Sequence, residues 1–268
     1  MSKTYIYDGT FEGLLCCIYA AYYIEMPTAI INSVEINEEA NGYQYNMAST
    51  PEILKNHQEI HIRTEAGKAD RVYEAINKKI SPYDLRQIYR AYISKLENKE
   101  MKILTYVKKG FKLGPNVSRL HGDKDVYEIQ RAAKQVGCEI DRMYGFVRFQ
   151  ELRGGIMFAR IDPDNDILAM LSRHFVSRFG NYPFIIYDEK RKKALFCRDK
   201  KWYITDFDEE KLPLPLSPDE KKYQDLWAEY FKNIAIKERT NEKCQLNHMP
   251  RRYWKNLTEI CTDVASHT

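Results

Sequence analysis

Apolar and polar positions alternate most clearly between residues 144 and 204, where the pattern predicts a sheet crossed by a helix. Aromatic and β-branched residues predict strands at 145–151 and 156–161, joined by a turn at Arg153-Gly154-Gly155. Three more strands are predicted after the helix, at residues 184–187, 194–197 and 202–204. A helix laid across two hairpins indicates the α+β class with a mostly antiparallel sheet.

The predicted helix, residues 164–179, carries one charged residue on its apolar face. At helical spacing the apolar residues form a single stripe, made of Ile167, Leu168, Leu171, Phe175 and Phe179. Arg178 falls inside this stripe and His174 on its edge. Because an unpaired buried charge is very costly, we expect Arg178 to be buried and paired. The partner is either Glu151 or Asp188 in a structural ion pair, or a phosphate or carboxylate ligand.

The remaining elements are mostly helical. Strands are predicted at residues 3–7 and 59–64, and helices at 11–25, 67–80, 83–96, 99–109 and 125–136. Residues 26–58 are weakly patterned and predict a connecting segment. We expect one α+β domain at 1–205, an acidic and Pro-rich linker at 206–219, and C-terminal helices at 220–268 docked on the same core.

Composition narrows the class of protein. The longest apolar run, residues 14–24, is too short to span a membrane, and we expect no signal peptide before it. The six cysteines lack paired spacing, which predicts reduced thiols in a cytoplasmic protein. No spacing of Cys, His or acidic residues supports a metal site, and no motif indicates a cofactor.

Basic charge is concentrated in two segments. The net charge is only +4, but residues 145–203 hold twelve Lys and Arg against seven Asp and Glu, and residues 237–255 hold six against two. In the second segment Arg251, Arg252 and Lys255 are interleaved with Tyr253 and Trp254. Cations and flat aromatic faces suit single-stranded or flipped nucleotides. Alternatively, the aromatic rings pack inward and the cations simply face solvent.

Three stretches carry a resemblance to a known family. They are the opening Tyr5-Ile-Tyr-Asp-Gly-Thr-Phe-Glu-Gly-Leu-Leu15, the central Gly145-Phe-Val-Arg-Phe149, and Met249-Pro-Arg-Arg-Tyr-Trp-Lys255. Over its full length the chain resembles bacterial proteins described as probable DNA metabolism proteins. The resemblance implies association with a radical SAM partner in DNA repair or modification, and in some members fusion to a uracil-DNA glycosylase-like domain. Asp141 stands where many relatives would carry His.

Three functions remain open from the sequence. The first is a factor that binds single-stranded or distorted DNA beside the radical SAM partner, with a uracil-DNA glycosylase-like protein as a further partner. Its candidate binding residues are Arg148, Lys190, Arg191, Arg239, Asn241, Gln245, Arg251, Arg252, Tyr253 and Trp254. The second is an enzyme acting on DNA or nucleotides, with His174 as acid or base, Arg178 as phosphate clamp, and Glu151 or Asp188 as carboxylate. The third is a protein-interaction adaptor without nucleic-acid contact.

Overall fold

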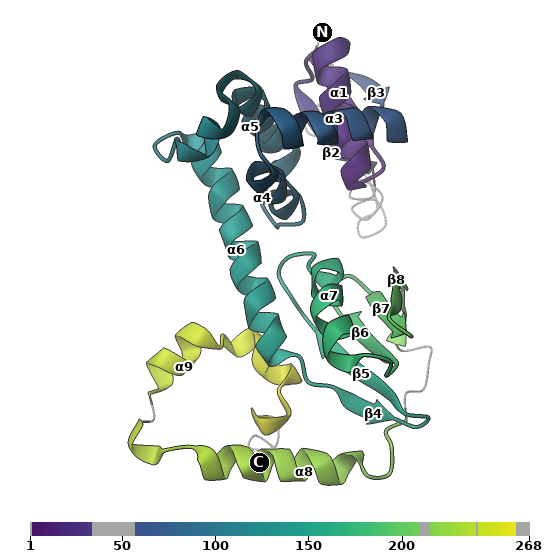
Figure 1. Ribbon diagram of the computed structural model, residues 1–268, viewed down its shortest axis with the longest axis vertical. Coiled ribbons are helices and arrows are strands. Elements are labelled where there is room, and N and C mark those ends of the chain that lie inside the picture. Colours follow the sequence, from purple (N-terminus) through teal and green to yellow (C-terminus); the bar gives the residue numbers. More distant parts are fainter. Residues whose placement is uncertain (1, 34–56, 210–214, 240, 261–268) are drawn as a thin grey trace, which may run out of the picture. The chain divides into compact units, whose positions relative to one another are not determined.

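The computed structural model describes residues 2–33, 57–209, 215–239 and 241–260 (Figure 1). Contacts divide the chain into two units, Met1–Val136 and Gly137–Thr268. The division falls inside helix α6 (Lys124–Phe146), within the range 1–205 over which the sequence predicted one α+β domain. Most of the expected connecting segment, residues 34–56, and residues 210–214 of the expected linker lie outside the described residues.

The first unit contains a small parallel sheet with helices packed against it. Its strands lie in the order β2 (Ala29–Asn32), β1 (Ser2–Tyr7), β3 (His57–His61). Its helices before α6 are α1 (Phe11–Tyr23), α3 (Ala66–Lys79), α4 (Pro82–Tyr92), α5 (Lys99–Leu113) and the 3-10 helix η3 (Gly114–Arg119). Thr10 caps α1 by accepting a hydrogen bond from the Gly13 N–H.

The second unit is built on a five-stranded sheet, with helix α7 (Leu168–Phe179) across one face (Figure 1). The strand order is β4 (Gln150–Leu152), β5 (Ile156–Ile161), β6 (Phe184–Asp188), β7 (Lys193–Arg198), β8 (Lys201–Asp206). Three of the four neighbouring pairs are antiparallel, which confirms the predicted α+β class. The pair β5–β6 is parallel, because α7 returns the chain to the same end of the sheet.

Two predicted boundaries in this unit are wrong. Helix α6 continues to Phe146, and the predicted strand at 145–151 shrinks to β4, because buried Val136, Ile140 and Met143 extend a helical spacing. Helix α7 begins at Leu168, four residues later than expected. The acidic residues before it form a loop instead, in which the N–H groups of Asp164 and Asn165 bond to the buried Glu139 carboxylate.

The C-terminal part of this unit is a series of short helices after one long one. They are α8 (Glu220–Ile234), the 3-10 helix η5 (Lys237–Arg239), α9 (Glu242–His248) and the 3-10 helix η6 (Arg251–Asn256). The apolar stripe of α8, which was expected to dock on the sheet, is largely exposed: Tyr223, Leu226 and Tyr230 are 61%, 52% and 54% exposed. No helix among the described residues has the length and apolarity needed to cross a membrane.

Candidate functional site

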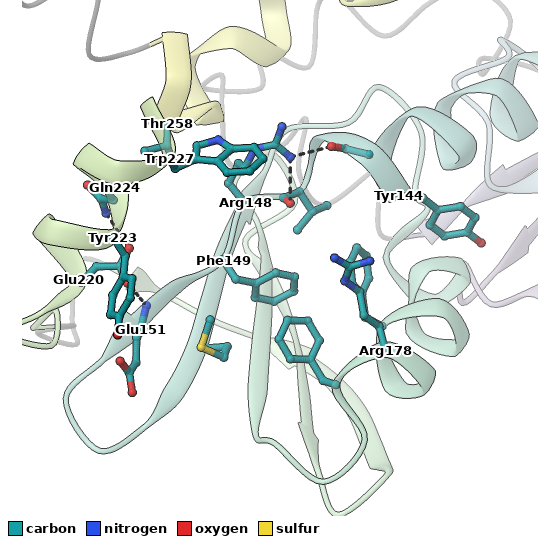
Figure 2. Close-up of a pocket in the computed structure, with 15 residues that line it drawn as sticks. Tyr144, Arg148, Phe149, Glu151, Arg178, Glu220, Tyr223, Gln224, Trp227 and Thr258 are labelled. Carbon is teal, nitrogen blue, oxygen red and sulfur yellow. Dashed lines mark hydrogen bonds between the residues drawn. The ribbon is translucent and has the colours of Figure 1, made fainter. Parts of the chain in front are cut away.

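A groove of about 790 Å³ opens in the second unit beside the C-terminal end of α7 (Figure 2). Its lining is largely aromatic: Tyr144, Phe149, Phe175, Phe179, Tyr223 and Trp227. Four charged side chains also line it, namely Arg148, Glu151, Arg178 and Glu220. The groove therefore offers flat apolar faces together with two cations and two carboxylates.

Phe149 anchors the aromatic wall. It lies in the short connection between α6 and β4, and its ring packs edge-on against Phe175 at 5.3 Å and Phe179 at 4.5 Å. Phe184, at the start of β6, completes the cluster at 6.0 Å from Phe149. These contacts fix the rings on the sheet, so this wall of the groove is a preformed surface.

Arg148 is held by contacts within the protein. Its guanidinium makes a two-pronged ion pair with Glu259, with Nη2–Oε1 and Nε–Oε2 distances of 2.6 and 3.0 Å. It also lies over the Trp227 ring, whose Nε1–H donates to the same carboxylate (Figure 2). Burial favours the neutral acid, but the hydrogen bonds from Arg148 and Trp227 outweigh it and hold the pKa of Glu259 below its usual range. The charge of Arg148 is thus largely neutralised.

The prediction that Arg178 is buried is wrong, because its side chain is exposed. It makes no hydrogen bond or ion pair with any residue that the structure describes, and Figure 2 shows its guanidinium pointing into the groove. The buried stripe of α7 runs through Leu171 and Phe175, and in the last turn Phe179 contacts the core instead. A long side chain in that turn can reach solvent, where it also faces the helix C-terminal dipole.

The two predicted carboxylates lie in different surroundings. Glu151 lines the groove, and its carboxylate accepts a hydrogen bond from Ser217 at 3.2 Å. Asp188 is fully buried at the other end of the sheet, and accepts from Arg191 Nη1 at 2.9 Å. Burial raises the pKa of Asp188, while Arg191 opposes that shift. Asp188 does not line the groove, so the structure does not bring the predicted acid–base set together.

His174 is not part of the groove lining. Its ring stacks on Tyr144 with a centroid distance of 4.2 Å, and its Nε2 atom is buried without a hydrogen-bond partner among the described residues. Together with Tyr144 and Arg178 it lines a second hollow of about 690 Å³. Arg178 therefore borders both hollows, and His174 borders one.

The C-terminal Arg-Arg-Tyr-Trp-Lys segment docks on the acidic end of the sheet. Tyr253 is buried and donates to Glu139 at 2.6 Å, and Arg252 pairs with Asp164 at 2.8 Å. Lys255 bridges Asp162 and Glu189 at 2.9 and 2.6 Å. These contacts agree with the alternative in which the aromatic ring packs inward, although the cations form ion pairs as well as facing solvent.

The other predicted binding residues are spread over the surface of the second unit. Arg239, Arg251, Gln245 and Lys190 do not line the groove, and the two arginines are exposed. Asn241 caps α9 by accepting from the Cys244 N–H, and Trp254 donates to the Met249 carbonyl. Arg191 supports the loop before α7 by donating to the Pro163 and Asp164 carbonyls.

Sequence reasoning missed Tyr223 and Trp227 as groove residues. They lie on the apolar stripe of α8, which periodicity alone assigns to the core. The stripe carries two Tyr and a Trp, which are residue types suited to partly solvated surfaces. This composition was the signal that could have indicated a binding surface. No cluster of three or more metal-ligating side chains occurs within the described ranges.

Comparisons with known proteins place the chain in a family without assigning it an activity. A search of curated proteins found no match. Among solved structures, a pGpG-specific phosphodiesterase, PggH from Vibrio cholerae, matches with a TM-score of 0.33 and 9% identity over 73% of this chain and 81% of that chain. A likeness this distant carries no argument about fold or function. The model of DUF4130, a domain of unknown function, matches residues 97–259, more than half of the chain, and the protein belongs to that family.

Proposed function

We propose that the protein is a DNA-binding factor whose second unit holds an unpaired nucleotide of single-stranded or distorted DNA. The observation that carries the proposal is an exposed cation, Arg178, pointing into an aromatic groove without a protein partner among the described residues. Bases stack on aromatic faces regardless of sequence, and a cation beside them binds the phosphate.

One exposed cation of the groove, Arg178, is available to a nucleic-acid phosphate. Arg148 is neutralised by Glu259, so Arg178 is the groove cation available for an anion in the part of the chain that the structure describes. Arg239 and Arg251 are exposed elsewhere on the same unit and can add electrostatic attraction. Arg252 and Lys255 are occupied by acidic partners and contribute less.

The partner in this proposal is a radical SAM protein, and the resemblance to probable DNA metabolism proteins is what suggests it. In such a pair the partner supplies the chemistry and the present chain holds the DNA strand for repair or modification. A uracil-DNA glycosylase-like protein is a second partner of the same kind. If the protein is instead an adaptor without nucleic-acid contact, it would bind the partner protein and show no affinity for DNA.

The role of Arg178 is tested by substituting it beside a matched arginine. Arg178→Ala should weaken binding of a labelled single-stranded oligonucleotide and reduce the slope of log affinity against log salt by about 0.7, because one phosphate is no longer neutralised. Arg173→Ala removes another exposed cation from the same helix, outside the groove, and should leave both quantities nearly unchanged. Equal effects of the two variants would contradict phosphate binding by Arg178 in the groove.

The stacking surface is tested on α8. Tyr223 lines the groove and is 61% exposed, so Tyr223→Ala should weaken binding by about 1–3 kcal/mol without changing the salt slope. Tyr230 lies on the same helix, is 54% exposed and is not part of the lining, which makes Tyr230→Ala the control. Unchanged affinity in Tyr223→Ala would exclude stacking on this wall.

A second candidate function is DNA or nucleotide processing, and the buried Nε2 atom of His174, which has no partner among the described residues, favours it. In this candidate His174 transfers a proton, Arg178 holds the phosphate, and Glu151 is the nearby carboxylate. Nuclease and glycosylase assays on intact and damaged DNA would show turnover that His174→Gln abolishes while DNA affinity is retained. Asp188 is left out of this role, because it is buried and serves the turn at Arg191.

A further inference from the structure

The end of the sheet that borders the groove continues into an exposed basic hairpin. The register places four residues in one row across the sheet, on the side that α7 covers: Met157, Phe184, Cys197 and Trp202. Met157 lines the groove and Phe184 contacts Phe179 of α7 at 5.2 Å, which fixes the side of the row. Trp202, 44% exposed on the edge strand β8, ends the row.

The spacing between groove and hairpin follows from the sheet itself. Three strand spacings separate Met157 from Trp202, and each is about 4.8 Å, so the two positions lie about 14 Å apart. An extended strand can therefore place one base in the groove and another on Trp202.

The hairpin supplies cations at this end. Arg198, Lys200 and Lys201 are all exposed around the β7–β8 turn, with Asp199 the acid between them. Asp199 and Lys200 have φ values of 51° and 63°, as the two central residues of a tight hairpin turn require. An Asn-Gly pair at these two positions would adopt the turn with less strain. Lys200 is therefore held at the tip of the hairpin at a conformational cost.

Cations at the opposite end of the same sheet are more closely matched by acids. Asp188 pairs with Arg191, Asp164 with Arg252, and Asp162 and Glu189 share Lys255. Asp206 faces Lys193 across the last register position of β7 and β8. The β7–β8 hairpin, with three cations around a single acid, therefore attracts a polyanion more strongly than these paired cations do.

Building on the proposed function, we infer that single-stranded DNA runs from the groove along this end of the sheet to the β7–β8 hairpin. Trp202 stacks on a second base, and Arg198, Lys200 and Lys201 contact the intervening and flanking phosphates. The site then has two separate stacking positions, and a mononucleotide or a dinucleotide occupies only one of them.

The inference is tested with oligothymidylates from a dinucleotide up to about 16 nucleotides, the upper end of the range that compact single-strand modules cover. Affinity of the wild type should rise with length until both stacking positions are filled. Trp202→Ala should weaken binding of the longer oligonucleotides at least about fivefold and leave the dinucleotide unaffected. Lys200→Ala with Lys201→Ala should lower the salt slope by about 0.7 for each phosphate that is no longer neutralised.

The neighbouring Tyr203 provides the control. It is 62% exposed, but its side chain lies on the other face of β8, where its ring stacks with Phe196 at 5.4 Å. Tyr203→Ala should therefore bind long oligonucleotides like the wild type. If Tyr223→Ala weakens binding and Trp202→Ala does not, the inference that DNA extends to the hairpin is overturned. The proposal that DNA binds in the groove is then retained. If the wild type binds no single strand at low salt, the proposed function fails with it.

Discussion

Two arginines of one groove show how local pairing decides what a residue does. Arg148 and Arg178 both line it, but only Arg148 meets a buried carboxylate among the described residues, that of Glu259, which is 3% exposed. Helical spacing predicted that Arg178 is buried, and this was wrong. Helical spacing shows in which direction a side chain leaves the helix, but it does not show where the neighbouring sheet ends. Arg148 stands in a segment predicted as a strand, and its partner lies 111 residues away, so no local pattern reveals the pair.

Arg148→Ala should destabilise the second unit by about 3 kcal/mol, since it leaves Glu259 buried without its cation. Arg178→Ala, in contrast, should change stability by less than about 0.5 kcal/mol, as expected for an exposed side chain. Urea unfolding followed by tryptophan fluorescence measures this unit alone, because all three tryptophans lie in it. Equal stability of the two variants would refute the structural role of Arg148.

The same pair predicts a pH dependence. Glu259 has a lowered pKa in the folded protein, so its pairing stabilises the fold above the ordinary glutamate pKa and is lost as pH falls through the lowered value. The stability difference between wild type and Arg148→Ala should therefore shrink when unfolding is measured below about pH 4. A difference that stays constant through this range would show that the lost stability is packing and not charge.

At the scale of elements, local sequence patterns predicted most helices and strands, whereas contacts between distant parts of the chain determine how the strands pair. The capping residues Thr10 and Ser81 stand at the starts of α1 and α4 in the structure. The parallel pairing of β5 with β6, and of the three strands described in the first unit, depends on crossovers that periodicity does not encode. The loop before α7 escaped prediction because its N–H groups bond to Glu139, a residue of another helix.

The docking of η6 gives a prediction at this scale. Tyr253→Phe removes the hydroxyl that donates to Glu139 and accepts from Arg252, and should cost about 1–3 kcal/mol because Glu139 is buried. Arg251→Ala, on the exposed side of η6, is the matched variant and should unfold like the wild type. Comparable urea midpoints for Tyr253→Phe and the wild type would show that the hydroxyl contacts do not hold η6.

At the scale of the whole molecule, the groove is a tertiary feature that sequence could not assemble. Its lining comes from α6, β4, β5, α7 and α8, and the aromatic residues of α8 were assigned to a core. The concentration of basic charge in residues 145–203 was visible in the sequence, but placing part of it beside the groove needs the strand register. The proposed function depends above all on DNA lying in this groove of the second unit.

Photo-crosslinking locates the DNA most directly. A single-stranded oligonucleotide carrying 5-iodouracil would be bound at low salt, irradiated, and the crosslinked peptides identified by mass spectrometry. We expect crosslinks to peptides that contain Phe149, Tyr223 or Trp227, and their disappearance on competition with unlabelled single strand. Crosslinks confined to residues 1–136, or to parts of the second unit outside the groove and the β7–β8 hairpin, would contradict DNA binding in the groove.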